Sequence, residues 1–196
     1  MLDRRQWFIR EHVGMLKLTD TYDILDPESG AVLGIAKERP GALVHVLRFV
    51  MKKGALPTRV EVFAGPEPDG SPVFTIKRGL TFIRSKVDIL DGTGRLLGWF
   101  KQKALSIGGS FRVFDANGNQ VATVKGNWKG FTFRFIDDQE QEVGVVSKQW
   151  SGLGKELFTT ADNYMIDIHG DPSPAKATLL LAAGLAIDTI FKERNG

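Results

Sequence analysis

The segment from Leu179 to Ile187 is apolar on every side of the helix that it is expected to form. A helix that is hydrophobic all round must be enclosed by protein or by lipid. Only eleven residues separate Lys176 from Asp188, and at ~1.5 Å per residue they extend for ~16 Å, whereas a membrane span needs ~20 apolar residues. We therefore predict no transmembrane span, and we expect the rest of the chain to enclose this helix.

The helix is predicted over residues 173–192, with Ser173 as the N-cap and Pro174 as the first helical residue. Small residues in its middle, such as Gly184, would narrow it where it meets inward-facing side chains. Burial of the large apolar side chains would stabilise the fold by roughly 9–18 kcal/mol, so the helix is essential to a domain with ~5–15 kcal/mol of net stability. These core residues are Leu179, Leu180, Leu181, Leu185, Ile187 and Ile190. Asp188 is the charge within this helix, and we expect an inward Arg or Lys from a strand to pair with it.

Upstream of the helix, a short pattern recurs in which an apolar alternating run leads to Asp, a turn and a second alternating run. Aspartate can accept hydrogen bonds from backbone N–H groups two residues ahead, and glycine supplies the positive φ of a tight turn. Each copy therefore predicts a β-hairpin. The copies span residues 22–37, 87–101, 111–125 and 133–148, and the fourth lacks the turn glycine. A fifth, looser hairpin is predicted over residues 60–76.

Further strands at Trp7–Glu11, Thr81–Ser85 and Tyr164–Ile168 bring the predicted total close to twelve. Consecutive hairpins with almost no helix between them exclude a parallel βαβ fold. Because eight strands make a barrel that its own side chains fill, about twelve leave room for one helix. The predicted fold class is mainly β: an antiparallel barrel over residues 6–170 around the C-terminal helix, in one domain spanning residues 1–196.

A second, short amphipathic helix is predicted over residues 42–53, where Leu43, Val46, Leu47 and Val50 follow helical spacing. Basic residues on and around it could form one patch near a barrel mouth and bind lipid head groups. The candidates are Lys37, Arg39, Arg48, Lys52, Lys53 and Arg59. The alternative is a solvated helix face. The net charge of +3 permits association with anionic membranes or nucleic acid but requires neither.

The last forty residues resemble the end of the phospholipid scramblase and LURP-one-related family, which has a Tubby C-terminal-like fold. The resemblance is carried by the segments 158–164, 182–188 and 191–193, and it extends over most of the chain without a catalytic motif. It implies phosphoinositide binding by the basic patch. It also implies calcium candidates before the final helix, namely Asp162, Asn163, Asp167 and Asp171. We expect no cofactor, since an EF-hand loop starting at Asp162 would place Tyr164 and Ile166 at ligand positions.

Catalytic patterns are not evident in the sequence. His12, His45 and His169 are isolated from one another, and Gly152–Lys155 lacks the spacing and the Ser or Thr of a phosphate-binding loop. Asp137, Asp138 and Glu140 fall in a predicted hairpin tip, where carboxylates are usually solvated. We therefore predict a protein that is not an enzyme. The absence of cysteine and of an apolar N-terminal signal favours a cytoplasmic location, which is compatible with peripheral association at the membrane.

Two functions remain open from the sequence. The first is a non-catalytic, peripheral lipid- or phosphoinositide-associated module that binds anionic membrane lipid. The second is a soluble scaffold or regulatory domain that binds a protein or nucleic-acid partner through its loops, with nucleic acid the less expected partner.

Overall fold

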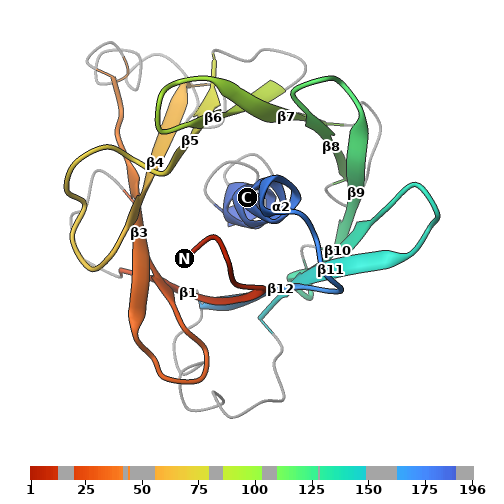
Figure 1. Cartoon of the computed structure of the whole chain (residues 1–196), viewed down its shortest axis with the longest axis horizontal. Coiled ribbons are helices and arrows are strands. Elements are labelled where there is room, and N and C mark those ends of the chain that lie inside the picture. Colours follow the sequence, from red (N-terminus) through yellow and green to blue (C-terminus); the bar gives the residue numbers. More distant parts are fainter. Residues whose placement is uncertain are drawn as a thin grey trace.

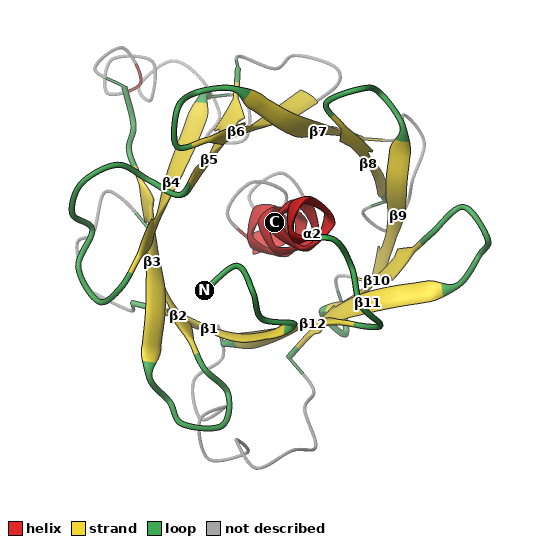
Figure 2. Ribbon diagram, in the orientation of Figure 1, coloured by secondary structure: helices red, strands yellow, loops and turns green. Residues whose placement is uncertain are grey.

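A computed structural model of the chain describes residues 1–12, 20–41, 44, 56–79, 86–102, 110–127, 129–148 and 163–188. Twelve antiparallel strands close into a barrel around one helix, as Figures 1 and 2 show. The strands are β1 (Gln6–Glu11), β2 (Thr21–Leu25), β3 (Val32–Glu38), β4 (Thr58–Ala64), β5 (Phe74–Arg78), β6 (Lys86–Asp91), β7 (Leu96–Gln102), β8 (Phe111–Asp115), β9 (Gln120–Asn127), β10 (Thr132–Ile136), β11 (Glu142–Ser147) and β12 (Tyr164–Ile168), and the helix is α2 (Pro174–Ala186).

This architecture confirms the predicted mainly-β fold class and all five predicted hairpins. Each strand pairs with its neighbours in sequence, and β1 pairs with β12 to close the ring: Phe8 lies opposite Leu25 on one side and Met165 on the other. The predicted strand over 81–85 lies outside the described residues. So does the predicted amphipathic helix, apart from the buried Val44.

The repeated Asp organises the turns of the four hairpins in the predicted way. The Oδ1 atom of Asp91 accepts hydrogen bonds from the backbone N–H groups of Thr93 and Arg95, at 2.9 and 3.0 Å. The same contacts, from the residues two and four positions ahead, recur at Asp115 and Asp137. Asp26 differs slightly, since its Oδ1 accepts from Glu28 and Ser29, two and three positions ahead. Each of these hairpins also contains a register shift beside the turn. The sequence repeat therefore encodes a complete structural unit of turn and bulge.

The fourth hairpin shows what the missing glycine costs. Gly94 and Gly118, three residues after their aspartates, have positive φ values of 86° and 90°. Glu140, which stands three residues after Asp137, adopts a φ of 61°. A side chain with a Cβ is disfavoured in this left-handed region by roughly 1–2 kcal/mol, so the Asp137 turn keeps its conformation against a local cost.

Helix α2 lies inside the barrel, with Leu180, Leu181 and Leu185 fully buried. Its N-terminus follows the predicted capping, since the Oγ of Ser173 accepts a hydrogen bond from the Lys176 N–H and Pro174 opens the helix. Gly184 is required for a close approach, because a Cβ at that position would stand 2.6 Å from Ile166 Cδ1. Within the described residues, no helix combines the length and the apolarity that crossing a membrane requires.

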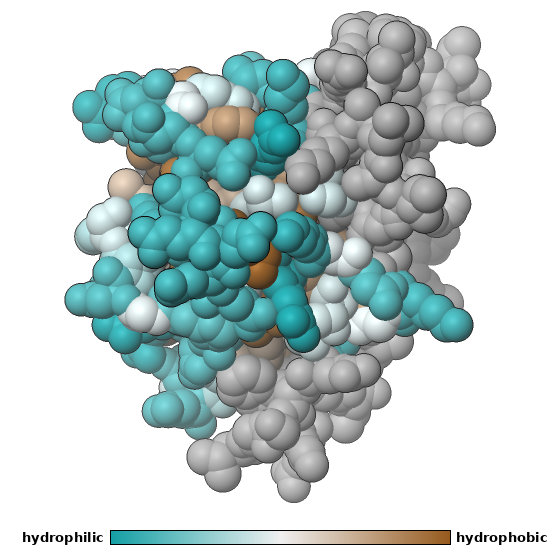
Figure 3. Space-filling model, turned by 90° about the vertical axis from the view of Figure 1, so that its right-hand side faces the viewer, coloured by the Kyte–Doolittle hydropathy of each residue, from teal (hydrophilic) through white to brown (hydrophobic). Residues whose placement is uncertain are grey.

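Strand alternation separates the two faces of the wall. Side chains such as Ile76, Phe100 and Phe133 point to the helix and are fully buried, while their neighbours in sequence face outward. Figure 3 shows one side of the molecule, where the described surface is mostly hydrophilic with small hydrophobic areas. A second apolar cluster, of Phe8, Leu25 and Met165, lies on the outer side of the wall across β1, β2 and β12.

The barrel has two distinct ends. The five hairpin turns and the start of α2 lie at one end, the turn end, and α2 finishes near Asp188 at the other, the far end. Asp188 is 3% exposed, and burial, followed by the charge of Asp188, raises the pKa of Tyr22 and Tyr164. The buried Arg78 donates to the Leu56 carbonyl and the Thr58 hydroxyl at this end. That a strand cation pairs with Asp188 stays a prediction.

Removal of the helix tests the architecture. Truncation after Gly170 is expected to give insoluble protein, because the inner wall would lose its apolar partner. In the full-length chain, Leu181→Asp should prevent folding, since it buries a charge in an apolar interior. Leu96→Asp serves as the control, because Leu96 is 39% exposed. Soluble truncated protein with a cooperative melting transition would contradict the dependence on α2.

The turn comparison gives a second prediction. Glu140→Gly should raise the free energy of unfolding by roughly 1 kcal/mol, because glycine relieves the positive φ at some entropic cost. Gly94→Ala should lower it by a similar amount, since no atom lies within 4 Å of the added Cβ and only the backbone conformation is strained. Urea denaturation of both variants measures the difference. Destabilisation by Glu140→Gly would contradict the view that Glu140 occupies the same strained position as Gly94 and Gly118.

Stability should also depend on pH through the turn aspartates. The side-chain amide of Asn119, together with nearby backbone N–H groups, lowers the pKa of Asp115. A lowered folded pKa means that this contribution is present above the unfolded value of about 3.9 and is lost as pH falls through the folded pKa. The melting temperatures of wild type and Asp115→Asn should therefore converge on acidification from pH 6 to pH 2. Asp69→Asn, in the exposed β4–β5 turn, is the control. A difference in melting temperature between wild type and Asp115→Asn that stays constant with pH would contradict the stabilising role of the Asp115 carboxylate.

Candidate functional site

Four cations gather on the outer wall at the far end of β3, β4 and β5. The backbone N–H of Arg39 donates to the Arg59 carbonyl at 2.7 Å, which places these residues side by side. Lys77 lies opposite Arg59 in the β4–β5 register, and Lys37 lies opposite Glu61 in the β3–β4 register. We call Lys37, Arg39, Arg59 and Lys77 the cationic site.

Glu61 holds the two arginines of the cationic site in place. Its Oε2 lies 3.2 Å from Arg39 Nε and its Oε1 lies 2.7 Å from Arg59 Nη2, while its own side chain is only 14% exposed. The two arginine side chains remain about half exposed, at 48% and 52%. Lys37 and Lys77 form no ion pair with any described residue. Asp88, opposite Lys77, pairs with Lys86 at 2.7 Å. The site therefore keeps an excess of positive charge that is open to solvent.

A pocket of about 280 Å³ lies within this site. Its apolar lining residues are Gly41, Val44 and Pro57, and its cationic lining residues include Arg39, Arg59 and Lys77. The buried guanidinium of Arg78 anchors one wall through its hydrogen bonds to the 56–58 segment. A pocket lined by both cationic and apolar residues has the chemistry to hold an anionic group that is attached to an apolar one.

Three of the six basic residues proposed from the sequence, Lys37, Arg39 and Arg59, thus lie together. Arg48, Lys52 and Lys53 lie outside the described residues. Sequence reasoning missed Lys77, although the hairpin pattern over residues 60–76 contained the signal: antiparallel pairing of Val60 with Ile76 places Lys77 opposite Arg59. The binding role of all these residues stays a prediction.

A further row of cations continues along the wall. Lys86, Lys101 and Arg112 are direct cross-strand neighbours on β6, β7 and β8. Like charges placed opposite each other destabilise a sheet, so this row lowers the stability of the barrel wall locally. Beside it, Trp99 and Phe114 stack with ring centroids 5.4 Å apart, and Lys86 Nζ lies 5.2 Å from the centre of the Trp99 ring.

The calcium candidates do not form a cluster in the described part of the chain. Asn163 is buried just before β12, and Asp167 lies four residues further along the strand, roughly 13 Å away at ~3.3 Å per residue. Asp171 is exposed and pairs with Arg5 at 2.7 Å. Asp162 lies outside the described residues. Among the residues with described positions, no three His, Cys, Asp or Glu side chains are grouped closely enough to hold a metal ion.

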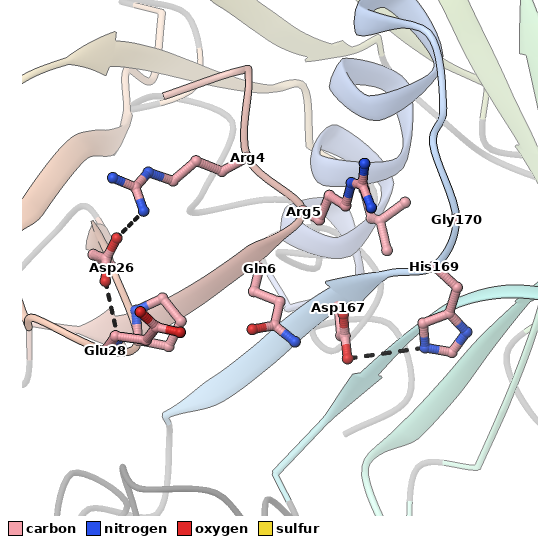
Figure 4. A pocket seen from close by; sticks show the side chains of 10 residues that line it. Arg4, Arg5, Gln6, Asp26, Glu28, Asp167, His169 and Gly170 are labelled. Atoms are coloured by element: carbon pink, nitrogen blue, oxygen red, sulfur yellow. Dashed lines mark hydrogen bonds and ion pairs between the residues drawn. The ribbon is translucent and has the colours of Figure 1, made fainter.

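A larger cavity of about 610 Å³ opens at the turn end, between the N-terminal segment, the β2–β3 turn and the end of β12. Figure 4 shows that charged side chains surround it. Both of its arginines are already paired: Arg4 contacts Asp26, and Arg5 lies 2.7 Å from Asp171. His169 Nε2 lies 3.9 Å from Asp167. Because cations and carboxylates offset each other here, this cavity has less excess charge to offer a ligand than the cationic site.

Two of the three histidines lie within the described residues, at opposite ends of the barrel. The Nε2 atom of His12 lies 2.6 Å from Asp23 Oδ1, and Arg10 contacts the other oxygen of the same carboxylate. His169 lies at the turn end, and His45 is outside the described residues. Asp137, Asp138 and Glu140 occupy a hairpin tip, as predicted.

Comparison with known proteins identifies similar segments in several phospholipid scramblases. Phospholipid scramblase 1 of Mus musculus is 44% identical over 59 residues, which cover 30% of this chain and 18% of that protein. Phospholipid scramblase 2 of Bos taurus is 40% identical over 63 residues, covering 32% and 21%. The human phospholipid scramblase 1 is 36% identical over 59 residues, covering 30% and 19%.

These matches span about a fifth of the length of the curated relatives. No solved structure matches the chain. The family model described as Scramblase matches residues 67–194, from the β4–β5 turn through the enclosed helix. This chain therefore belongs to the Scramblase family.

Proposed function

We propose that this chain is a non-catalytic module that associates peripherally with anionic membrane lipid through the cationic site. The observation that carries the proposal is the excess of exposed positive charge around Glu61, where two lysines lack any acidic partner among the described residues. Membership of the Scramblase family supports a lipid-related role. The cytoplasmic leaflet, whose lipids are partly anionic, is the surface that suits this charge.

General electrostatics bounds the strength of the attraction between the cationic site and an anionic membrane. Each Lys or Arg near an anionic membrane surface contributes ~1 kcal/mol, and the attraction falls off within a Debye length. The Lys86–Lys101–Arg112 row adds cations on neighbouring strands, but the barrel curves between β3 and β8 (Figure 1). A flat membrane therefore cannot meet both groups fully at once, so the cationic site is tested by itself.

Vesicle flotation tests the proposal. Wild-type protein should float with vesicles that contain phosphatidylserine or phosphoinositide, remain unbound with phosphatidylcholine alone, and dissociate as salt is raised. Arg59→Gln/Lys77→Gln should weaken binding roughly tenfold or more, from ~1 kcal/mol per charge. Glu61 keeps Arg39 as a partner in this variant, so no carboxylate loses every cation.

The matched control removes two charges at the turn end. Arg5 and Arg95 are 55% and 82% exposed, and Arg5→Gln/Arg95→Gln produces the same change in net charge. This control should float like wild type. Equal losses in both double variants would show that only net charge matters, and binding that ignores anionic lipid and salt would end the proposal.

A further inference from the structure

We propose that the pocket in the cationic site takes the glycerol and first acyl carbons of one anionic lipid molecule, while Arg39, Arg59 and Lys77 hold its phosphate. The site would then recognise an individual anionic amphiphile and not only a charged surface. This inference rests on the proposed function, since the same cations attract the membrane.

The lining of the pocket favours an amphiphile over a bare anion. Gly41, Val44 and Pro57 are apolar lining residues, of which Val44 is almost fully buried. The volume of about 280 Å³ is just below the ~300–1,000 Å³ of sites that enclose a drug-sized ligand. A pocket of this size can take the neck of a lipid but not its whole acyl chains, so the rest of each chain would remain outside.

The rim favours an anionic head group over a neutral or zwitterionic one. Glu61 contacts both arginines from one side at 2.7 and 3.2 Å, which restrains the guanidinium groups before a ligand arrives. Guanidinium presents paired N–H donors that match phosphate oxygens. Lys77 adds a cation without an ion-pair partner in the described structure. The phosphate would therefore meet a partly preorganised set of donors at the mouth of an apolar pocket.

The first experiment compares three monomeric ligands by calorimetry on the full chain. Dihexanoyl phosphatidic acid, kept below its micelle concentration, supplies the phosphate and short acyl chains. Glycerol 3-phosphate supplies the head group alone, and dihexanoyl phosphatidylcholine supplies the same chains with a zwitterionic head. The phosphatidic acid should bind at least tenfold more tightly than either of the others.

The second experiment fills the pocket. Gly41 lines it, has no positive φ, and would meet no atom within 4 Å of an added Cβ, so Gly41→Leu adds a larger side chain to the lining without a backbone clash. This variant should bind the phosphatidic acid at least tenfold more weakly and should retain wild-type affinity for glycerol 3-phosphate. Gly130→Leu is the matched control, because Gly130 is equally unobstructed and lies outside the pocket.

The outcomes separate this inference from the proposed function. Wild-type protein that floats with anionic vesicles but binds glycerol 3-phosphate as tightly as phosphatidic acid would overturn the pocket and leave the membrane association standing. Unchanged amphiphile binding in Gly41→Leu would overturn it too. Tight, Gly41-dependent binding of phosphatidic acid without vesicle flotation would support the pocket and refute the association with membranes.

Discussion

Enclosure of α2 by the strands is the constraint on which the whole structure depends. A helix with no polar face can be kept from water only by a continuous apolar surface around it, and a closed ring of twelve strands provides one. The fit is tight where the helix is narrowest: Gly184 stands against Ile166, where a Cβ would be only 2.6 Å from the isoleucine side chain. The inner face of the barrel wall packs against α2, so a ligand site can lie only on the outer face or at the two ends.

The repeated hairpin is how the chain builds that wall with local signals. Each Asp fixes a turn through backbone N–H groups, and the turn fixes which residues of the returning strand face the helix. The Asp137 copy retains the geometry without glycine, because the carboxylate contacts persist while Glu140 takes the left-handed conformation. The hydrogen-bonding aspartate is therefore the more constant part of the unit, and glycine is the part that lowers its cost.

The cationic site combines features that separate strands supply. Arg59 and Lys77 come from β4 and β5 and Arg39 directly follows β3, and Glu61 holds the two arginines by accepting from both guanidinium groups. The larger cavity at the turn end shows the opposite balance, with Arg4 and His169 already beside carboxylates. The distribution of unpaired charge, more than the volume of a cavity, is what distinguishes the described surfaces at the two ends of the barrel.

The sequence by itself determined the barrel, its five hairpins, the Asp-based turns and the buried helix, because each follows from local periodicity, turn chemistry or the length of one apolar segment. It also selected Lys37, Arg39 and Arg59 as a group. The position of Lys77 opposite Arg59 followed from the predicted hairpin over residues 60–76. Only the tertiary structure decided that Glu61 bridges the arginines and that a pocket opens beside Gly41. These features depend on strand register and on contacts between residues up to several tens of positions apart, which a pattern along the chain does not specify.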